Sequence, residues 1–199
     1  YENQKQKKWD NRIRLDEAYG KTLGILGLGA IGTEIAKRAK AFGMKVIALR
    51  RNRGEVPQFV DELYSLEERM KLFEESDFLV VLLPVTPETI HFVGEEELAA
   101  MKNSAYLINI ARGAIVDEQA LIKSLQENRI AGAVLDVFVE EPLPEDHVLW
   151  TLPNVIITPH NAGSSPKYIE RALEIFRHNL DAYPNKEKMR NVIDLDRGY

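Results

Sequence analysis

The stretch LGILGLGAIGTEIA, residues 23–36, decides the fold, because Gly27, Gly29 and Gly32 interrupt an otherwise almost entirely apolar run. Their spacing, G-x-G-x-x-G, lies between an apolar segment of strand length and a segment of helical period. Glycines at such a turn let backbone N–H groups and a helix N-terminus meet a pyrophosphate. A tight turn can also need glycine for steric reasons alone. With a strand before it and a helix after it, the motif predicts dinucleotide binding.

The same alternation of strand and helix patterns continues along the chain. We predict strands at 22–28, 45–49, 77–83, 105–109, 131–137 and 154–158, and helices at 31–42, 65–76, 95–101, 117–128 and 166–183. Gly43 should end the first of these helices, and Ser65 should cap the second. Six or so strands, buried on both sides and each followed by a crossover, predict an α/β fold. We expect a doubly wound parallel sheet (Rossmann fold) with helices on both faces.

The composition excludes several classes of protein. Of 199 residues, 45% are hydrophobic, which suffices for one substantial core, and no segment approaches the roughly 20 apolar residues of a membrane helix. The first residues lack the apolar stretch of a signal peptide. There is no cysteine, the four histidines are scattered, and the net charge is -5. We therefore expect a cytoplasmic protein with no metal, nucleic acid or membrane partner.

The run RRNR at residues 50–53 follows the second predicted strand. In dinucleotide-binding folds the residue at this place meets the adenosine ribose, and an acidic side chain there accepts hydrogen bonds from the hydroxyls of NAD. Here Arg50 takes that place, followed by Arg51 and Arg53. A guanidinium pairs with a 2′-phosphate that a carboxylate would repel, so we expect NADP(H) to be preferred and NAD(H) to be possible. The alternative is a solvated basic loop.

Three further stretches point to a family: NIARGAIVDEQAL (109–121), LDVFVEEPLP (135–144) and TPHNAGSS (158–165). Together with GKTLGILGLGAIG and LLPVTPET they resemble the NAD(P)-binding domain of the D-isomer-specific 2-hydroxyacid dehydrogenases, in order from about Trp9 to Ser165. The resemblance implies an NAD(P)-dependent oxidoreductase that transfers a hydride between the cofactor and a small 2-keto or D-2-hydroxy acid. Corepressors that resemble these enzymes give the alternative, an NAD(H)-sensing binding module.

The resemblance also implies three catalytic residues. Arg112 would bind the substrate carboxylate and polarise the carbonyl, a role that suits a planar guanidinium. His160 would be the acid/base and Glu141 its partner, since a hydrogen-bonded carboxylate favours the protonated imidazole. A buried structural ion pair is the alternative for Arg112. Glu140, beside Glu141, is expected to be solvated or to make a loop contact.

Asp136 ends a strand of otherwise apolar residues, where an ionised carboxylate is costly without a partner. The resemblance makes it the acceptor for the nicotinamide carboxamide, while a structural cap of the following loop is the alternative. The glycine motif, the RRNR run and, for the residues after position 82, the resemblance together give the expected cofactor-binding residues: Gly27, Gly29, Ala30, Ile31, Gly32, Arg50, Arg51, Leu83, Pro84, Ile110, Ala111, Arg112, Asp136, His160 and Gly163.

Members of this family carry a substrate domain before the glycine motif that is completed at the carboxyl end. We therefore expect this chain to be a piece of such a protein, inactive alone. Residues 1–20 would be the remnant of a connecting helix, 21–165 the NAD(P)-binding Rossmann domain, and 166–199 a helix and an extended tail returning to the substrate domain. The resemblance implies a homodimer. The apolar face of the helix at 166–183 would lack its cover, and we expect it to be mobile or to pack against another copy.

Overall fold

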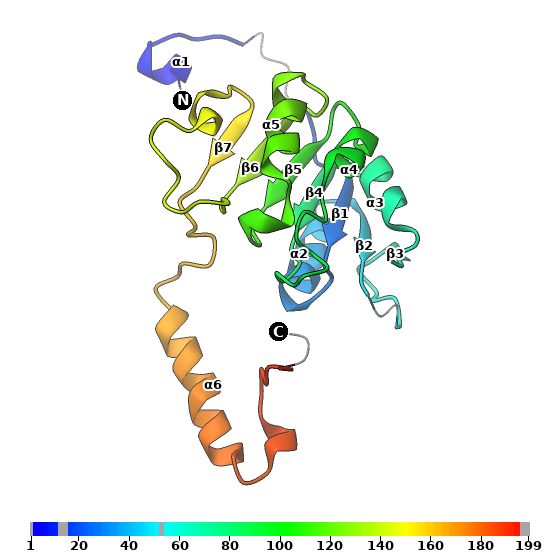
Figure 1. Ribbon diagram of the computed structural model, residues 1–199, viewed down its shortest axis with the longest axis vertical. Coiled ribbons are helices and arrows are strands. Elements are labelled where there is room, and N and C mark those ends of the chain that lie inside the picture. Colours follow the sequence, from blue (N-terminus) through cyan, green and yellow to red (C-terminus); the bar gives the residue numbers. More distant parts are fainter. Residues whose placement is uncertain (1, 12–15, 52–53, 196–199) are drawn as a thin grey trace.

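The computed structural model describes residues 2–11, 16–51 and 54–195 (Figure 1). The strands are β1 (Thr22–Leu26), β2 (Lys45–Leu49), β3 (Glu62–Tyr64), β4 (Phe78–Val81), β5 (Tyr106–Asn109), β6 (Gly132–Leu135) and β7 (Val155–Ile157). The α-helices are α1 (Glu2–Lys5), α2 (Ala30–Ala41), α3 (Arg69–Glu75), α4 (Glu95–Ala100), α5 (Glu118–Gln126) and α6 (Tyr168–Ala182). Three short 3-10 helices are η1 (Gly113–Ile115), η2 (Val148–Thr151) and η3 (Lys186–Lys188).

All seven strands form one parallel sheet in the order β3-β2-β1-β4-β5-β6-β7. Strand β1 lies between β2 and β4, and Leu23 pairs with Val46 on one side and Phe78 on the other. The order of strands reverses at β1, which in open α/β sheets creates a crevice at the carboxyl ends of the strands. The predicted doubly wound Rossmann fold is confirmed.

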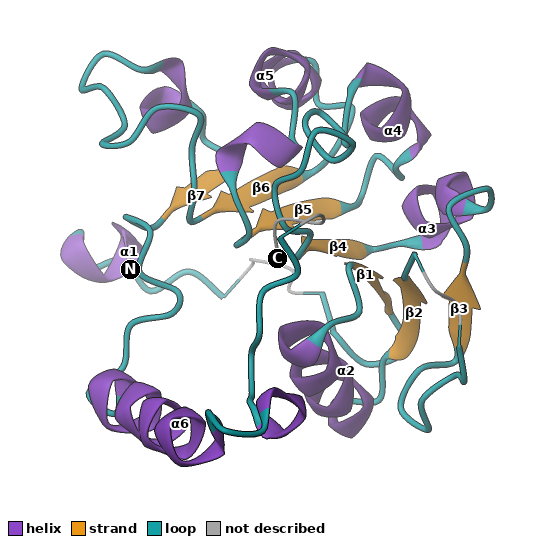
Figure 2. Ribbon diagram, turned by 60° about the horizontal axis from the view of Figure 1, so that its bottom comes forward, coloured by secondary structure: helices purple, strands orange, loops and turns teal. Residues whose placement is uncertain are grey.

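Helices cover the two faces of the sheet unequally (Figure 2). Helices α3, α4 and α5 lie on one face, over a core that includes the fully buried Phe73 and Leu107. Helix α2 lies on the other face and contributes Ala36 to a second core. The expectation of strands buried on both faces holds for β1 and β2 but is wrong for β5 and β7. There Tyr106 of β5 and Ile156 of β7 are 41% and 61% exposed.

The region before α3 differs from the prediction in two ways. Strand β3 was not predicted, and it pairs with β2 through Ile47 and Glu62. The helix expected at 65–76 begins only at Arg69, so Ser65 is not its cap. The chain needs a turn between the end of β3 and α3, and there the backbone N–H of Ser65 donates to the carboxylate of Glu68 at 3.4 Å. Gly43 does end α2, with a positive φ of 74°.

Helix α6 lies apart from the sheet (Figure 1), and within it only Ala182 is buried. The tail after it is not simply extended as expected, because it folds back through η3 and the side chain of Asn179 hydrogen bonds the backbone of Arg190. Of the helix expected at 1–20, α1 forms only Glu2–Lys5, and residues 12–15 lie outside the described part. None of the helices in the described ranges has the length and apolar character needed to span a membrane.

Candidate cofactor and active site

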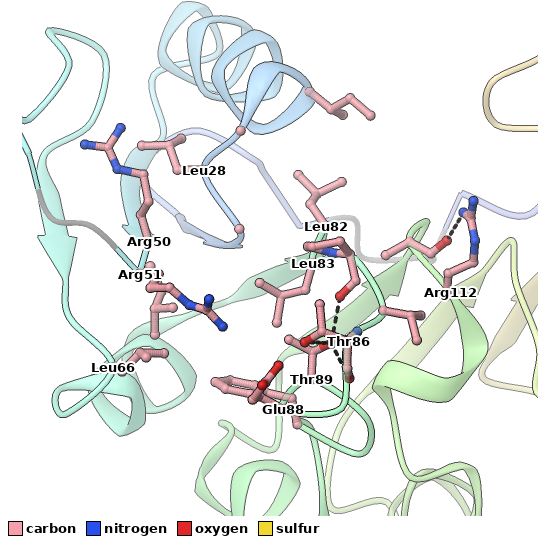
Figure 3. A pocket seen from close by; sticks show the side chains of 18 of the residues that line it. Leu28, Arg50, Arg51, Leu66, Leu82, Leu83, Thr86, Glu88, Thr89 and Arg112 are labelled. Carbon is pink, nitrogen blue, oxygen red and sulfur yellow. Dashed lines mark hydrogen bonds between the residues drawn. The ribbon is translucent and has the colours of Figure 1, made fainter. Parts of the chain in front are cut away.

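A cavity of about 730 Å³ runs along the carboxyl ends of β1, β2, β4 and β5 (Figure 3). Parallel strands bring all their carboxyl ends to one edge, so residues far apart in the sequence meet there. Ten of the expected cofactor residues line this cavity: Gly27, Gly29, Ile31, Arg50, Arg51, Leu83, Pro84, Ile110, Ala111 and Arg112. Five others are not among its lining residues: Ala30, Gly32, Asp136, His160 and Gly163.

The three glycines of the motif meet different surroundings. Gly27 has a φ of 109°, and a Cβ there would lie 3.0 Å from the backbone of Leu82. A Cβ on Gly32 would lie 2.7 Å from the carbonyl oxygen of Gly27, so this glycine lets α2 pack against the turn. A Cβ on Gly29 would meet no atom within 4 Å. The protein itself therefore gives no steric reason for a glycine at position 29.

The N-terminus of α2 opens at this same place. Gly29 is its N-cap residue, and the helix has no side-chain capping bond and no acidic residue in its first turn. The first N–H groups of a helix lack partners within the helix, and the helix dipole favours an anion beside them. The turn between β1 and α2 therefore has the chemistry of a phosphate-binding site.

Two arginines, Arg50 and Arg51, follow β2 and line the end of the cavity where we expect the adenosine of the cofactor. Figure 3 shows the guanidinium of Arg51 pointing across the cavity toward Glu88, whereas Arg50 extends beside Leu28. A hydrogen bond from Thr86 lowers the pKa of Glu88, and the positive charge of Arg51 lowers it further. Arg53, the third arginine of the run, lies outside the described residues.

A tight turn after β4 forms the opposite wall of the cavity. The hydroxyl of Thr89 donates to the carbonyl oxygen of Pro84 at 2.7 Å and accepts the N–H of Thr86 at 2.8 Å. These bonds fix the backbone that carries Leu83 and Pro84. Sequence reasoning missed nine lining residues: Leu28, Leu49, Leu66, Leu82, Val85, Thr86, Glu88, Thr89 and Phe92. The motif LLPVTPET held a signal for five of them, because its threonines are typical of a turn.

Arg112 is presented by a turn that Asn109 holds in place. Asn109 is buried at the end of β5; its side-chain nitrogen donates to the carbonyl oxygen of Arg112 at 3.0 Å, and its side-chain oxygen accepts the N–H of Ala111 at 3.1 Å. The Arg112 side chain is exposed rather than buried in an ion pair, and its Nη1 donates to the carbonyl oxygen of Ala111 at 2.6 Å. Sequence reasoning missed Asn109, although a polar residue that ends an apolar strand is a signal.

His160 and Glu141 form a close pair. The imidazole Nδ1 lies 2.6 Å from Oε2 of Glu141, whose other oxygen accepts the N–H of Phe138 at 2.9 Å. Partial burial raises the pKa of the Glu141 carboxyl, but hydrogen bonds from His160 and Phe138 and the charge of Arg112 outweigh it, so that the pKa lies below its ordinary value. The structure thus brings Arg112, Glu141 and His160 to neighbouring strand ends. Glu140 is exposed, as expected.

Asp136 fastens the turn that presents His160. One oxygen of its carboxylate accepts the hydroxyl of Thr158 at 2.5 Å and the N–H of Asn161 at 3.0 Å, and the other accepts the N–H of Ala162 at 2.9 Å. Burial raises the pKa of Asp136, but these three bonds and the charge of His160 lower it by more. The contacts are those of a structural cap, although the capped turn follows β7 rather than β6. The expected bond to the nicotinamide carboxamide stays a prediction.

The backbone at His160 has a positive φ of 48°. Such a conformation is uncommon for a residue with a side chain, and it persists only where surrounding contacts hold it. The bonds to Asp136 are those contacts. In the described part of the chain, no group of three or more histidine, aspartate or glutamate side chains is arranged to hold a metal ion.

Comparisons with known proteins show the family of the chain. A family model described as the NAD binding domain of D-isomer specific 2-hydroxyacid dehydrogenase matches residues 1–162. The glyoxylate reductase of Korarchaeum cryptofilum is 45% identical over 183 residues, which are 90% of this chain and 54% of that protein. The D-3-phosphoglycerate dehydrogenase of Methanocaldococcus jannaschii is 40% identical over 195 residues, 96% of this chain and 36% of that one.

A solved structure shares the whole fold. The D-isomer specific 2-hydroxyacid dehydrogenase from Xanthobacter autotrophicus Py2, crystallised with NADPH and MES, has a TM-score of 0.89 and 34% sequence identity. The matched region covers 100% of this chain and 80% of the Xanthobacter chain. The chain spans about half the length of the glyoxylate reductase and a smaller share of the phosphoglycerate dehydrogenase.

Proposed function

The chain belongs to the D-isomer specific 2-hydroxyacid dehydrogenase family, and on that premise we propose that it is the cofactor-binding part of an oxidoreductase. The reaction is a reversible hydride transfer between NADP(H) or NAD(H) and a small 2-keto or D-2-hydroxy acid. The observation that supports this most directly is the cavity that joins the glycine turn to Arg112 along one edge of the sheet.

The residues of the cavity fit a dinucleotide. The open space at Gly29 and the uncapped N-terminus of α2 suit a pyrophosphate, which needs N–H donors and room for its oxygens. Leu83, Pro84 and Ile110 offer an apolar wall farther along the cavity, toward Arg112, where the nicotinamide would lie. When bound, the nicotinamide supplies or accepts the hydride.

Three residues at neighbouring strand ends, of which Arg112 lines the cavity, supply the remaining chemistry. Arg112 binds the carboxylate of the 2-keto acid and orients its carbonyl. His160 donates a proton to the carbonyl oxygen as the carbonyl carbon receives the hydride, so that a hydroxyl group forms. Glu141 holds Nδ1 of the imidazole at 2.6 Å and leaves Nε2 to face the substrate. In the oxidation the same imidazole takes the proton back.

NADP(H) is the preferred cofactor in this proposal. Arg50 and Arg51 both line the cavity where an acidic residue would mark an NAD site. The solved structure from Xanthobacter autotrophicus Py2 was crystallised with NADPH, which supports the same preference. The alternative for these arginines, a solvated loop without a ligand, predicts no difference between the two cofactors.

The test is a fluorescence titration of this chain with NADPH and with NADH. We expect NADPH to bind more tightly, and Arg50→Asp or Arg51→Asp to weaken NADPH binding about tenfold or more while changing NADH binding less. Arg171→Asp, the same change on the exposed α6, is the matched control. Equal binding of both cofactors would contradict the preference, and binding of neither by the folded chain would contradict a complete dinucleotide site.

The substrate side of the cleft is proposed to come from outside these 199 residues, since the chain spans about half of its glyoxylate reductase relative. Residues 1–20 and 166–199 would connect the Rossmann domain of residues 21–165 to that substrate domain. The names of the relatives favour glyoxylate or another small 2-keto acid as the substrate. The homodimer and the cytoplasmic location stay predictions.

A further inference from the structure

The loop from Val139 to His147 carries Glu141, and both of its ends contact one side chain, that of Glu118. At the start of the loop the N–H of Val139 donates to Oε2 of Glu118 in a long hydrogen bond of 3.5 Å. At its end Nε2 of His147 lies 3.3 Å from Oε1 of the same carboxylate. A single carboxylate thus bridges the two ends of the loop.

The pair of Glu118 and His147 has a defined geometry. Nδ1 of His147 accepts the N–H of Leu149 at 3.3 Å, so in the neutral ring Nε2 carries the hydrogen and directs it at Glu118. The side chains of Glu118 and His147 are only 18% and 20% exposed. Glu118 lies in the first turn of α5, where the helix dipole favours a negative charge. These features distinguish the pair from an exposed ion pair, which contributes little.

The start of the loop is also held by close packing. A Cβ on Gly113, in η1, would overlap the backbone of Phe138 and Val139, so the turn that follows Arg112 lies directly against the loop. The N–H of Phe138 then donates to Glu141 at 2.9 Å. Any movement of Phe138 or Val139 would therefore be transmitted to the carboxylate that contacts His160.

We propose that Glu118 and His147 are positioning residues, which clamp the 139–147 loop so that Glu141 stays against Nδ1 of His160. This inference rests on the proposed role of His160 as the acid/base. Neither residue touches the cofactor cavity. Their contribution is to keep the hydrogen of the neutral imidazole on Nδ1, which leaves Nε2 available to the substrate oxygen.

The test measures where the hydrogen of His160 resides, with the 199-residue chain labelled with nitrogen-15. Long-range proton–nitrogen correlation spectra at alkaline pH, where an imidazole is neutral, report the ratio of Nε2–H to Nδ1–H tautomers. We expect this ratio to rise roughly fivefold in Glu118→Ala, the effect of losing one ordinary hydrogen bond. His147→Phe should act in the same direction.

Glu118→Gln is the graded variant, because an amide offers one acceptor oxygen to two donors and can hold one end of the loop but not both. Its ratio should fall between those of the wild type and Glu118→Ala, and it serves if the alanine variant does not fold. Glu127→Gln is the matched control: it removes a carboxylate at the other end of α5, where Glu127 pairs with Arg129 at 2.6 Å. The control should leave the His160 ratio unchanged.

Glu141→Gln separates the two proposals. If this variant shifts the tautomer ratio while Glu118→Ala and Glu118→Gln do not, the clamp is wrong and the pair of Glu141 and His160 stands. If Glu141→Gln itself leaves the ratio unchanged, the role given to Glu141 in the proposed function is wrong. A purely structural role of Glu118 would lower the thermal midpoint without moving the His160 tautomer ratio, and that result would also overturn the clamp.

Discussion

Helices α3 and α6 are both amphipathic, but only one of them buries its apolar face. In α3, Phe73 is fully buried in the core that lies between the sheet and helices α3, α4 and α5. In α6, Phe176 is 60% exposed, and its neighbours on the same face, Leu173 and Leu180, are 55% and 59% exposed. The comparison shows that an apolar stripe predicts a helix and a buried face without specifying what covers that face.

Amide hydrogen exchange should show the largest difference between these two regions. The strands of the sheet can exchange only by opening against much of the global stability, whereas a helix of this length without packing is marginal in water. We expect amides of β4 to exchange more slowly than those of α6 by on the order of a thousandfold or more. Exchange in α6 as slow as in β4 would show that another copy, or another part of the chain, covers it in solution.

A pair of phenylalanine substitutions sharpens the comparison. Phe73→Ala removes a fully buried ring and should lower the free energy of unfolding by about 3–5 kcal/mol. Phe176→Ala makes the same chemical change on α6 and should alter it by about 0.5 kcal/mol or less. Urea unfolding followed by circular dichroism measures both. A loss above about 1 kcal/mol for Phe176→Ala would mean that its face is packed.

The smallest expected effect is a loss of folding stability at acidic pH. Asp77 accepts the N–H of Thr22 at 2.8 Å and Nζ of Lys102 at 2.9 Å. Burial raises the pKa of Asp77, but these hydrogen bonds lower it by more, so that the pKa lies below the ordinary value of 3.8. Because the pKa is depressed in the folded state, the stabilisation is fully present above pH 3.8 and is lost as the pH falls through the lower folded value.

The measurement for Asp77 is the free energy of unfolding as a function of pH. Asp77→Asn should be less stable than the wild type at neutral pH, and the difference should shrink on acidification below the ordinary carboxyl value. Asp181→Asn, the same change on the exposed α6, should follow the wild-type curve. A constant difference between Asp77→Asn and the wild type at every pH would show that the charge of Asp77 is not involved.

Much of the fold was predictable because its signals are local and repeated. The G-x-G-x-x-G turn, the apolar strands and Gly43 each depend on a few adjacent residues, and each was confirmed within one or two positions. Strand β3 could not be predicted, because three residues are too short for a period and their conformation depends on pairing with β2. The wrong prediction of Ser65 as the helix cap has the same origin, because β3 ends at Tyr64 and α3 begins only at Arg69, after a turn.

For the candidate site, the functional residues could be predicted, but the residues that hold them in place could not. The resemblance named Arg112, Glu141 and His160, and the sheet brings their strand ends together. The hydrogen bonds that hold them depend on contacts between segments far apart in the sequence. Asp136 reaches across to Asn161, and Glu118 bridges both ends of a later loop. A pattern along one chain contains no information on such pairings.

The contact between Gly113 and Phe138 has a consequence for engineering this protein. The turn after Arg112 and the loop that carries Glu141 fit each other with no room for a single methyl group. A designer who transplants only one of these segments from a relative would import a surface shaped for a different neighbour. The smallest exchangeable unit at this end of the cleft is therefore the two segments together, with α5 and its Glu118 between them.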